Sequence, residues 1–155
     1  MIKYAEQDEE RADCYYGRGV YFDTKTKKSK CVWINKEIEL DPRKSFENQV
    51  GICQPSVYFR SSTKEIKESL ETLKDSLVFD YELWIKLAHK GVSFKFIDEN
   101  FSKFNLTDTN ITNNRREEQL EETLHMVESY YNRANSNWRN RILDFKNRKL
   151  TGIMD

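Results

Sequence analysis

One acidic residue stands where a predicted helix begins, and a carboxylate at such a position can take part in proton transfer. The residues after Asp80 are apolar at the three-and-four spacing of an amphipathic helix: Leu83, Trp84, Leu87 and Ala88. Gly91 follows where such a helix is expected to stop. The residues alone leave two interpretations. Asp80 is either an N-cap that accepts bonds from free backbone N–H groups, or an ionised group at the mouth of a site.

A polar turn lies upstream of this helix and is the second candidate for a site. Pro55 removes a backbone donor and biases Gln54 toward an extended conformation. The segment from Gln54 to Ser56 is therefore either the ordinary start of a strand or a rigid shelf beside a binding site. Arg60 follows, and its planar guanidinium suits a phosphate or a carboxylate, although a surface arginine is the simpler interpretation.

The elements that must position these residues alternate between helix and strand. Residues 92–98 alternate apolar and polar side chains as a half-buried strand does, so a helix returns to a strand as in α/β layering. Upstream, we predict a helix over residues 2–12 and a hairpin of two strand-like runs, residues 14–23 and 30–40, with a lysine-rich tip. A short helix is expected at residues 43–50. Ser62 and Glu65 have capping-box spacing ahead of a helix that presents Ile66, Leu70 and Leu73 to the sheet.

The order of these motifs resembles the C-terminal, acceptor-side half of the inverting family 2 glycosyltransferases, which have the GT-A fold. The resemblance rests on Gln54-Pro55-Ser56, an aromatic pair before Arg60, the run from Asp80 to Trp84, and a strand that ends in Ile97-Asp98. It covers about residues 11–112, and residues 51–112 are its most specific part. It implies an α/β, partial GT-A-like mixed sheet with flanking helices over residues 1–112, followed by a helical C-terminal extension over residues 113–155.

The resemblance also implies an activity. In that family the aspartate that opens this helix is the general base, and the role carries over to Asp80. The implied reaction transfers a sugar from a nucleotide-sugar donor to a glycan, lipid-linked or protein acceptor with inversion, assisted by Mg²⁺ or Mn²⁺. The implied substrate-binding residues are Gln54, Pro55, Ser56, Arg60, Glu82 and Trp84. For Trp84 a core position is the alternative to stacking on a sugar, and Glu82 is alternatively a favourable acid in the first helical turn.

The chain departs from the family in three places. Asn105 and Thr107 stand where relatives commonly carry an arginine and a histidine that help to hold the metal or the diphosphate. Arg18 replaces an acidic residue after Tyr16-Gly17. Nothing resembles the family's first half, which supplies the nucleotide-binding strands and the acidic metal motif, so we expect that half to be missing and find no evident metal ligands. The alternative is a non-catalytic remnant that binds a partner or a glycan through its helical tail.

Composition narrows the class of protein. The 155 residues fit one domain, and a mean hydropathy of −0.85 with 34% charged residues predicts a modest core. Lysine plus arginine and aspartate plus glutamate both total 26, which gives no reason to expect nucleic acid as a partner. No apolar run has the length of a membrane span, and the acidic N-terminus is unlike a secretory signal, so we expect a cytoplasmic protein.

The metal-binding residue types give no pattern for a metal site. Cys14, Cys31 and Cys53 lack a close Cys-x-x-Cys spacing, and reduced, partly buried thiols are the expected state. We interpret His89 and His125 as surface or satisfied histidines. The run Asp8-Glu9-Glu10 is interpreted as a solvated helix face rather than a cluster for a hard cation.

The C-terminal segment has apolar residues at alternating spacings of four and three: Leu120, Leu124, Val127, Tyr131, Ala134 and Trp138, with Ile142 and Phe145 continuing. This pattern predicts an amphipathic helix that breaks near residues 135–137. Its apolar seam could pack on its own domain, form a homodimer, or lie peripherally against a membrane. The membrane alternative depends on five basic residues near its end: Arg139, Arg141, Lys146, Arg148 and Lys149.

Overall fold

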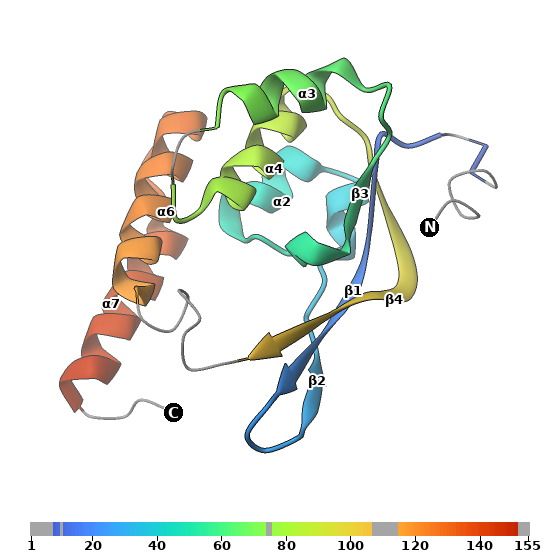
Figure 1. The fold of residues 1–155 in the computed structure, drawn as a ribbon. Helices are drawn as coiled ribbons and strands as arrows, with labels where there is room; N and C mark the ends of the chain where they lie inside the picture. Colours follow the sequence, from blue (N-terminus) through green and yellow to red (C-terminus); the bar gives the residue numbers. More distant parts are fainter. Residues whose placement is uncertain (1–7, 10, 74–75, 107–114, 152–155) are drawn as a thin grey trace.

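The computed structural model describes residues 8–9, 11–73, 76–106 and 115–151, which form an α/β fold around a mixed open sheet (Figure 1). The central strand is β1 (Cys14–Asp23). β4 (Phe94–Leu106) runs parallel to β1 and pairs with it along its whole length. β3 (Val57–Phe59) pairs antiparallel with the start of β1, and β2 (Ser29–Cys31) pairs antiparallel with its later part. Because β4 occupies one edge of β1, β2 and β3 share the other edge.

Three α-helices lie beside the sheet: α2 (Pro42–Asn48), α3 (Lys64–Glu71) and α4 (Phe79–His89). The ring of Phe46 on α2 meets Phe94 edge-on, with ring centroids 5.4 Å apart. Trp84 on α4 lies against Phe59, at 5.9 Å between centroids. The sequence-based predictions of β1, α2, α4 and the strand near residue 94 are confirmed. Gly91 follows α4 with a φ of +79°, a conformation that favours glycine, and so ends the helix as expected.

The second strand of the predicted hairpin is shorter than expected. β2 covers three residues, and a 3-10 helix, η1 (Lys36–Glu39), replaces the rest of the predicted run. The side-chain oxygen of Asn35 accepts a bond of 3.0 Å from the backbone N–H of Glu37, and Tyr16 donates its hydroxyl to the carbonyl of Asn35 at 3.0 Å. These bonds turn the chain inward, so that Ile38 is buried in the core.

The N-terminal helix prediction is wrong for the residues that the structure describes. Residues 8, 9, 11 and 12 are not helical, and Arg11 has a φ of 53°. Asp8 is buried rather than solvated. Its carboxylate accepts bonds from the Ala12 N–H at 2.9 Å and the Tyr15 hydroxyl at 2.8 Å, and it forms an ion pair with Lys95 at 2.6 Å. These partners hold the pKa of Asp8 well below its usual range. Residues 1–7 and 10 lie outside the described part.

The capping box ahead of α3 does not form. Thr63, rather than Ser62, occupies the N-cap position and makes no capping bond with its side chain. Its hydroxyl instead donates to the carboxylate of Asp13 at 3.1 Å. The predicted apolar face holds only in part, because Ile66 is buried while half of Leu70 is exposed. A tertiary contact has replaced a local one.

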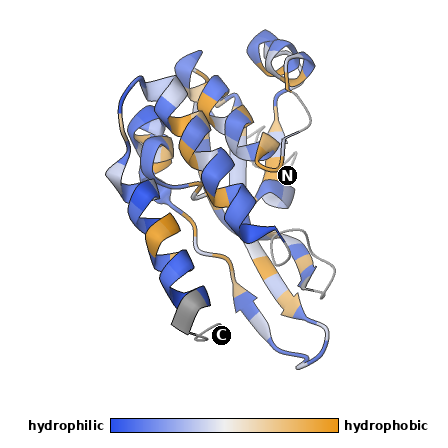
Figure 2. Ribbon diagram, turned by 90° about the vertical axis from the view of Figure 1, so that its left-hand side faces the viewer, coloured by the Kyte–Doolittle hydropathy of each residue, from blue (hydrophilic) through white to orange (hydrophobic). Residues whose placement is uncertain are grey.

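The C-terminal segment forms a hairpin of two helices, α6 (Arg116–Tyr131) and α7 (Ser136–Thr151). The first helix ends slightly earlier than predicted, before Asn132, which has a left-handed φ of 49°. The buried residues of the hairpin belong to the same hydrophobic cluster as those of the sheet and of α4: Leu120, Val127, Trp138 and Ile142. The seam therefore packs on its own domain. Figure 2 shows that the outward faces of the two helices are mainly hydrophilic.

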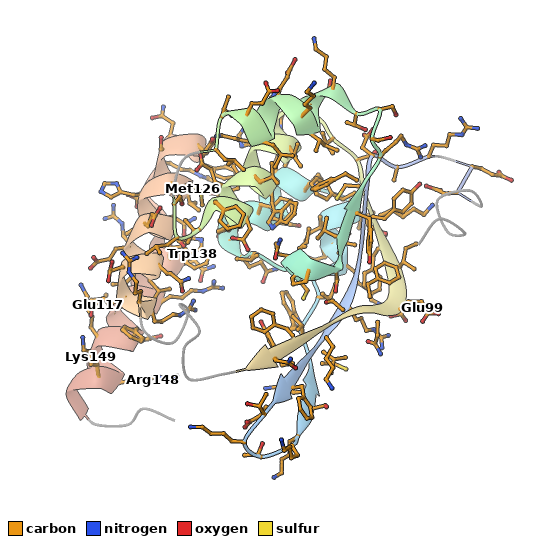
Figure 3. All side chains as sticks on the ribbon, viewed as in Figure 1. Glu99, Glu117, Met126, Trp138, Arg148 and Lys149 are labelled. Carbon is orange, nitrogen blue, oxygen red and sulfur yellow. The ribbon has the colours of Figure 1, made fainter. Side chains whose placement is uncertain are left out.

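The basic end of α7 is largely matched by acidic residues of α6. Lys149 forms an ion pair with Glu117 at 3.0 Å, and both side chains lie at the same end of the hairpin (Figure 3). Lys146 and Arg139 also pair with glutamates of α6, at 2.8 Å each. These pairs offset the positive patch on which the membrane alternative depended. Among the described residues, no helix has both the length and the apolar character needed to cross a membrane.

Candidate active site

Asp80 lies in the first turn of α4 but is not its N-cap. The helix begins one residue earlier, at Phe79, because the N–H of Glu82 bonds to the carbonyl of Val78 at 3.0 Å and closes the first turn there. Val78 takes the cap position without a capping side chain. The carboxylate of Asp80 accepts a bond of 2.8 Å from the N–H of the adjacent Tyr81. The N-cap interpretation is therefore wrong.

The surroundings of Asp80 make its carboxylate a stronger base than a solvated one. Burial raises the pKa of Asp80 above its ordinary value, and the bonds from the backbone at Tyr81 and at Asp80 itself offset only part of that effect. The side chain is half-buried, so it keeps a route to solvent. A carboxylate with a raised pKa takes up a proton more readily than an ordinary aspartate.

Residues from several elements lie within electrostatic range of Asp80 or of its neighbours. The pKa of Tyr21 on β1 is raised by burial first, and then by the nearby Cys53 and Asp80, while Arg116 at the start of α6 opposes these effects. Burial, and then the positive charge of Arg141 on α7, lower the pKa of Arg116. Neither arginine forms an ion pair with another described residue. Tyr21 is thus within electrostatic range of both Asp80 and Arg116, and Arg141 is within range of Arg116.

The Gln-Pro-Ser turn is firmly held beside β1. η2 (Gln54–Ser56) is a short 3-10 helix, and the hydroxyl of Ser56 donates to the carbonyl of Arg18 at 2.9 Å. Cys53, which precedes it, lies so close to Gly19 that a Cβ on that glycine would be 2.3 Å from the Cys53 sulfur. Gln54 and Pro55 are exposed on this fixed base. η2 leads directly into β3, so the turn is the start of that strand and is rigidly held there.

The predicted arginine of the site is occupied elsewhere. Arg60 donates to the carbonyl of Ala12, at 3.3 and 3.2 Å, and to the hydroxyl of Tyr15 at 3.3 Å. Tyr15 in turn donates to Asp8, so the guanidinium is part of the network that fixes the chain before β1. This position gives Arg60 a structural role at the start of the sheet.

Glu82 and Trp84 also have structural partners. Glu82 forms an ion pair with Lys86 at 2.9 Å and accepts a bond from the hydroxyl of Tyr130 at 3.2 Å, which ties α4 to α6. Trp84 is 2% exposed, so its ring has no free face on which a sugar could stack. Its helical spacing places it on the buried side of α4, and the core interpretation is the one that the structure supports.

Near the end of β4, the described position at which relatives commonly carry an arginine is not cationic in this chain. Asn105 is exposed and pairs with Phe22 in the sheet. Thr107 lies outside the described residues. No group of three or more histidine, cysteine, aspartate or glutamate side chains in the described part could hold a metal ion. The three cysteines are free thiols, with Cys14 and Cys53 buried.

Sequence reasoning named Asp80 and the Gln-Pro-Ser turn as candidates but did not relate Tyr21, Arg116 and Arg141 to one another. The chain brings these residues together only through the fold, and no short motif contains two of them. Comparisons with protein families, with curated proteins and with solved structures found no match to this chain.

Proposed function

We propose that this chain is the acceptor-side portion of an inverting family 2 glycosyltransferase of the GT-A type, with Asp80 as the general base. The observation that carries the proposal is the half-buried carboxylate of Asp80, whose pKa is raised, in the first turn of α4. The rigid Gln-Pro-Ser turn, with Gln54 and Pro55 exposed, provides further support. The order of these motifs in the sequence is the reason for naming this family.

The proposed reaction is a single displacement. Asp80 takes the proton from an acceptor hydroxyl while that oxygen forms a bond to the anomeric carbon of the nucleotide sugar. The bond from that carbon to the diphosphate breaks on the opposite face, and the nucleoside diphosphate leaves with the bonding electrons. A base at the start of a helix can lie within hydrogen-bond reach of such a hydroxyl. Acceptors of three kinds remain candidates: glycans, lipid-linked sugars and proteins.

The donor side of the reaction belongs to a nucleotide-binding portion, which we propose acts together with this chain. In the proposed enzyme, Mg²⁺ or Mn²⁺ bound by that portion would neutralise charge on the departing diphosphate. Arg116 lies within electrostatic range of Tyr21, and Arg141 lies within electrostatic range of Arg116, so the two arginines would add positive charge on this side. They offer cations that Asn105 and Thr107 do not. The three free thiols agree with a cytoplasmic location, which is part of the proposal.

The substitution Asp80→Asn tests the assignment of the base. In the chain joined to its nucleotide-binding portion, we expect turnover to fall by roughly 10²- to 10⁴-fold, because general-base catalysis contributes about that much. Turnover is measured by release of nucleoside diphosphate. Asp144→Asn, which changes an exposed carboxylate on α7, should leave turnover unchanged. Unaltered turnover in Asp80→Asn would show that Asp80 is not the base.

A stability measurement separates loss of the base from loss of the fold. Because the folded-state pKa of Asp80 is raised, its ionised form costs stability at neutral pH, and a neutral asparagine removes that cost. We expect the melting temperature of Asp80→Asn at pH 7 to be no lower than that of the parent chain. A clear drop would mean that the side chain is mainly structural.

The rival function, a non-catalytic module that binds partners or glycans through its helical tail, receives less support from the fold. Leu120, Val127 and Trp138 of the tail are buried in the chain's own core, so its apolar seam is not free to dock. Melting the chain with nucleotide sugars and Mn²⁺ tests the non-catalytic module in one direction, since a ligand that binds only the native state raises the melting temperature. A metal-dependent rise would count against the non-catalytic module.

A further inference from the structure

A groove beside the β1–β2 hairpin is not explained by the residues assigned so far. It has a volume of about 630 Å³ and is lined by three cations, three aromatic residues and three smaller side chains: Arg18, Lys30, Lys36, Tyr21, Trp33, Phe96, Cys31, Val32 and Ile34. Figure 1 shows that this end of β1 and β2 extends away from the helices. Trp33 is 62% exposed, which is unusual for a large aromatic ring on a domain with a modest core.

The groove carries positive charge. None of the described residues that line it is acidic. Arg18 pairs with Asp98 outside the lining, and both side chains are about half exposed. Lys30 forms no ion pair with another described residue, and the ammonium of Lys36 lies 4.9 Å from the centre of the Phe96 ring. Arg18 is neutralised by Asp98, and Glu39 accepts a bond from the Phe96 N–H beside the lining, so the positive charge of the groove is that of Lys30 and Lys36.

The segment that carries Trp33 is fixed to the sheet on both sides of the ring. The N–H of Val32 donates to the carbonyl of Gly19 at 2.9 Å, and the N–H of Asn35 donates to the carbonyl of Gly51 at 3.0 Å. The groove is therefore formed before any ligand arrives, and binding need not order this segment.

We infer that this groove binds an acidic saccharide whose sugar rings carry carboxylates. The exposed ring of Trp33 offers a flat apolar face for the C–H face of a pyranose, and Lys30 and Lys36 offer charge for the carboxylates. A single-stranded nucleic acid fits less well, because it stacks successive bases on several aromatic platforms, whereas one ring here is widely exposed. Tyr21 lines the groove and also lies within electrostatic range of Asp80.

A saccharide in this groove would extend toward Asp80 and act as the acceptor, an assignment that depends on the proposed function. Binding itself does not depend on it. The substitution Asp80→Asn should therefore lower transfer by roughly 10²- to 10⁴-fold and leave saccharide binding intact, so that failure of one hypothesis is distinguishable from failure of the other.

Tryptophan fluorescence gives a direct readout, because Trp84 and Trp138 are 2% and 4% exposed while Trp33 is 62% exposed. The full chain is titrated with a hexamer of galacturonic acid, and acrylamide quenching of Trp33 is followed. We expect saturable protection of Trp33 by the acid. The fully methyl-esterified hexamer has the same rings without the charge and should bind at least about tenfold more weakly, which corresponds to about 1.4 kcal/mol.

Variants locate the binding on the groove. By calorimetry, Lys30→Glu with Lys36→Glu, and separately Trp33→Ala, should each weaken binding by about tenfold or more. Lys67→Glu, on the exposed side of α3, reverses a similar charge elsewhere and should have no effect. The inference is overturned if the acid does not bind, if the ester binds equally well, if the groove variants bind like the parent chain, or if oligothymidylate binds more tightly than the acid.

Discussion

At the scale of single residues, His89 shows how burial can set the pH range in which this protein is stable. Its ring lies near the end of α4 against those of Tyr131 and Tyr130, at 5.2 and 5.9 Å between centroids. Its Nε2 atom is buried without a hydrogen-bond partner among the described residues. Burial first, and then the charge of Arg43, lower the pKa of His89 below its usual 6.5. The folded state therefore favours the neutral ring.

We expect acid to destabilise the protein through His89. As the pH falls below about 6.5, His89 takes up a proton in the unfolded chain, whereas in the folded chain it takes up a proton only at a lower pH. The free energy of unfolding therefore falls as the pH falls through this range. The substitution His89→Gln removes this dependence. Urea unfolding at pH 7 and pH 5 checks the difference, with the exposed His125→Gln as the matched control. Equal losses in the parent chain and His89→Gln would contradict the prediction.

At the scale of elements, Trp138 joins the helical hairpin to the α/β portion. Its indole N–H donates to the carbonyl of Glu47 at 3.1 Å, and its ring lies 5.7 Å from that of Tyr81, the residue after Asp80. Figure 3 shows Trp138 on the side of the hairpin that faces α4. The hairpin thus supports the turn of α4 that carries the candidate base.

Truncation of this side chain should destabilise the whole domain. We expect Trp138→Ala to lower the free energy of unfolding by about 3–5 kcal/mol, because it leaves a cavity and removes the indole donor. Leu143→Ala, on the 57% exposed side of the same helix, should cost far less. Urea titration at pH 7 measures both. Similar costs for the two variants would mean that the hairpin is only loosely attached.

At the scale of the whole molecule, one hydrophobic cluster extends from Cys14 on β1 to Ile142 on α7. The α/β portion and the helical extension therefore share a core, although the sequence changes character between them. Two segments with a common core are expected to unfold together.

A single cooperative transition is the expected result. In a Trp33→Phe background, emission reports on Trp84 in the α/β portion and on Trp138 in the hairpin, both buried. The urea midpoint from emission should coincide with that from far-ultraviolet circular dichroism. Separate midpoints, with helical signal lost before the change in emission is complete, would show that residues 113–155 unfold independently.

Local patterns in the sequence were sufficient for β1, α2, α4 and the stop at Gly91. Each depends on the alternation, periodicity or turn chemistry of neighbouring residues, which act within a few positions of the chain. The predictions that failed are those in which a distant partner replaced a local one. Asp8 was expected on a solvated helix face, yet Lys95 and Tyr15 bury it. Thr63 was expected within a capping box, yet it bonds to Asp13.

The surroundings of the candidate site were decided by the tertiary structure alone. Tyr21 lies on β1, and the position of β1 is set by its parallel pairing with β4. The register of this pairing shifts on both sides of Arg18. Packing of the α6–α7 hairpin brings Arg116 toward that residue. The groove at Trp33 exists because the chain leaves the β1–β2 pairing after Val32, and the N–H of Asn35 bonds to the carbonyl of Gly51. Pairing and packing join residues far apart in the chain, and no short-range pattern encodes such distances. The sequence by itself determined the α4 helix and the position of Asp80 near its start, whereas the burial and charge around Asp80 arose from long-range packing.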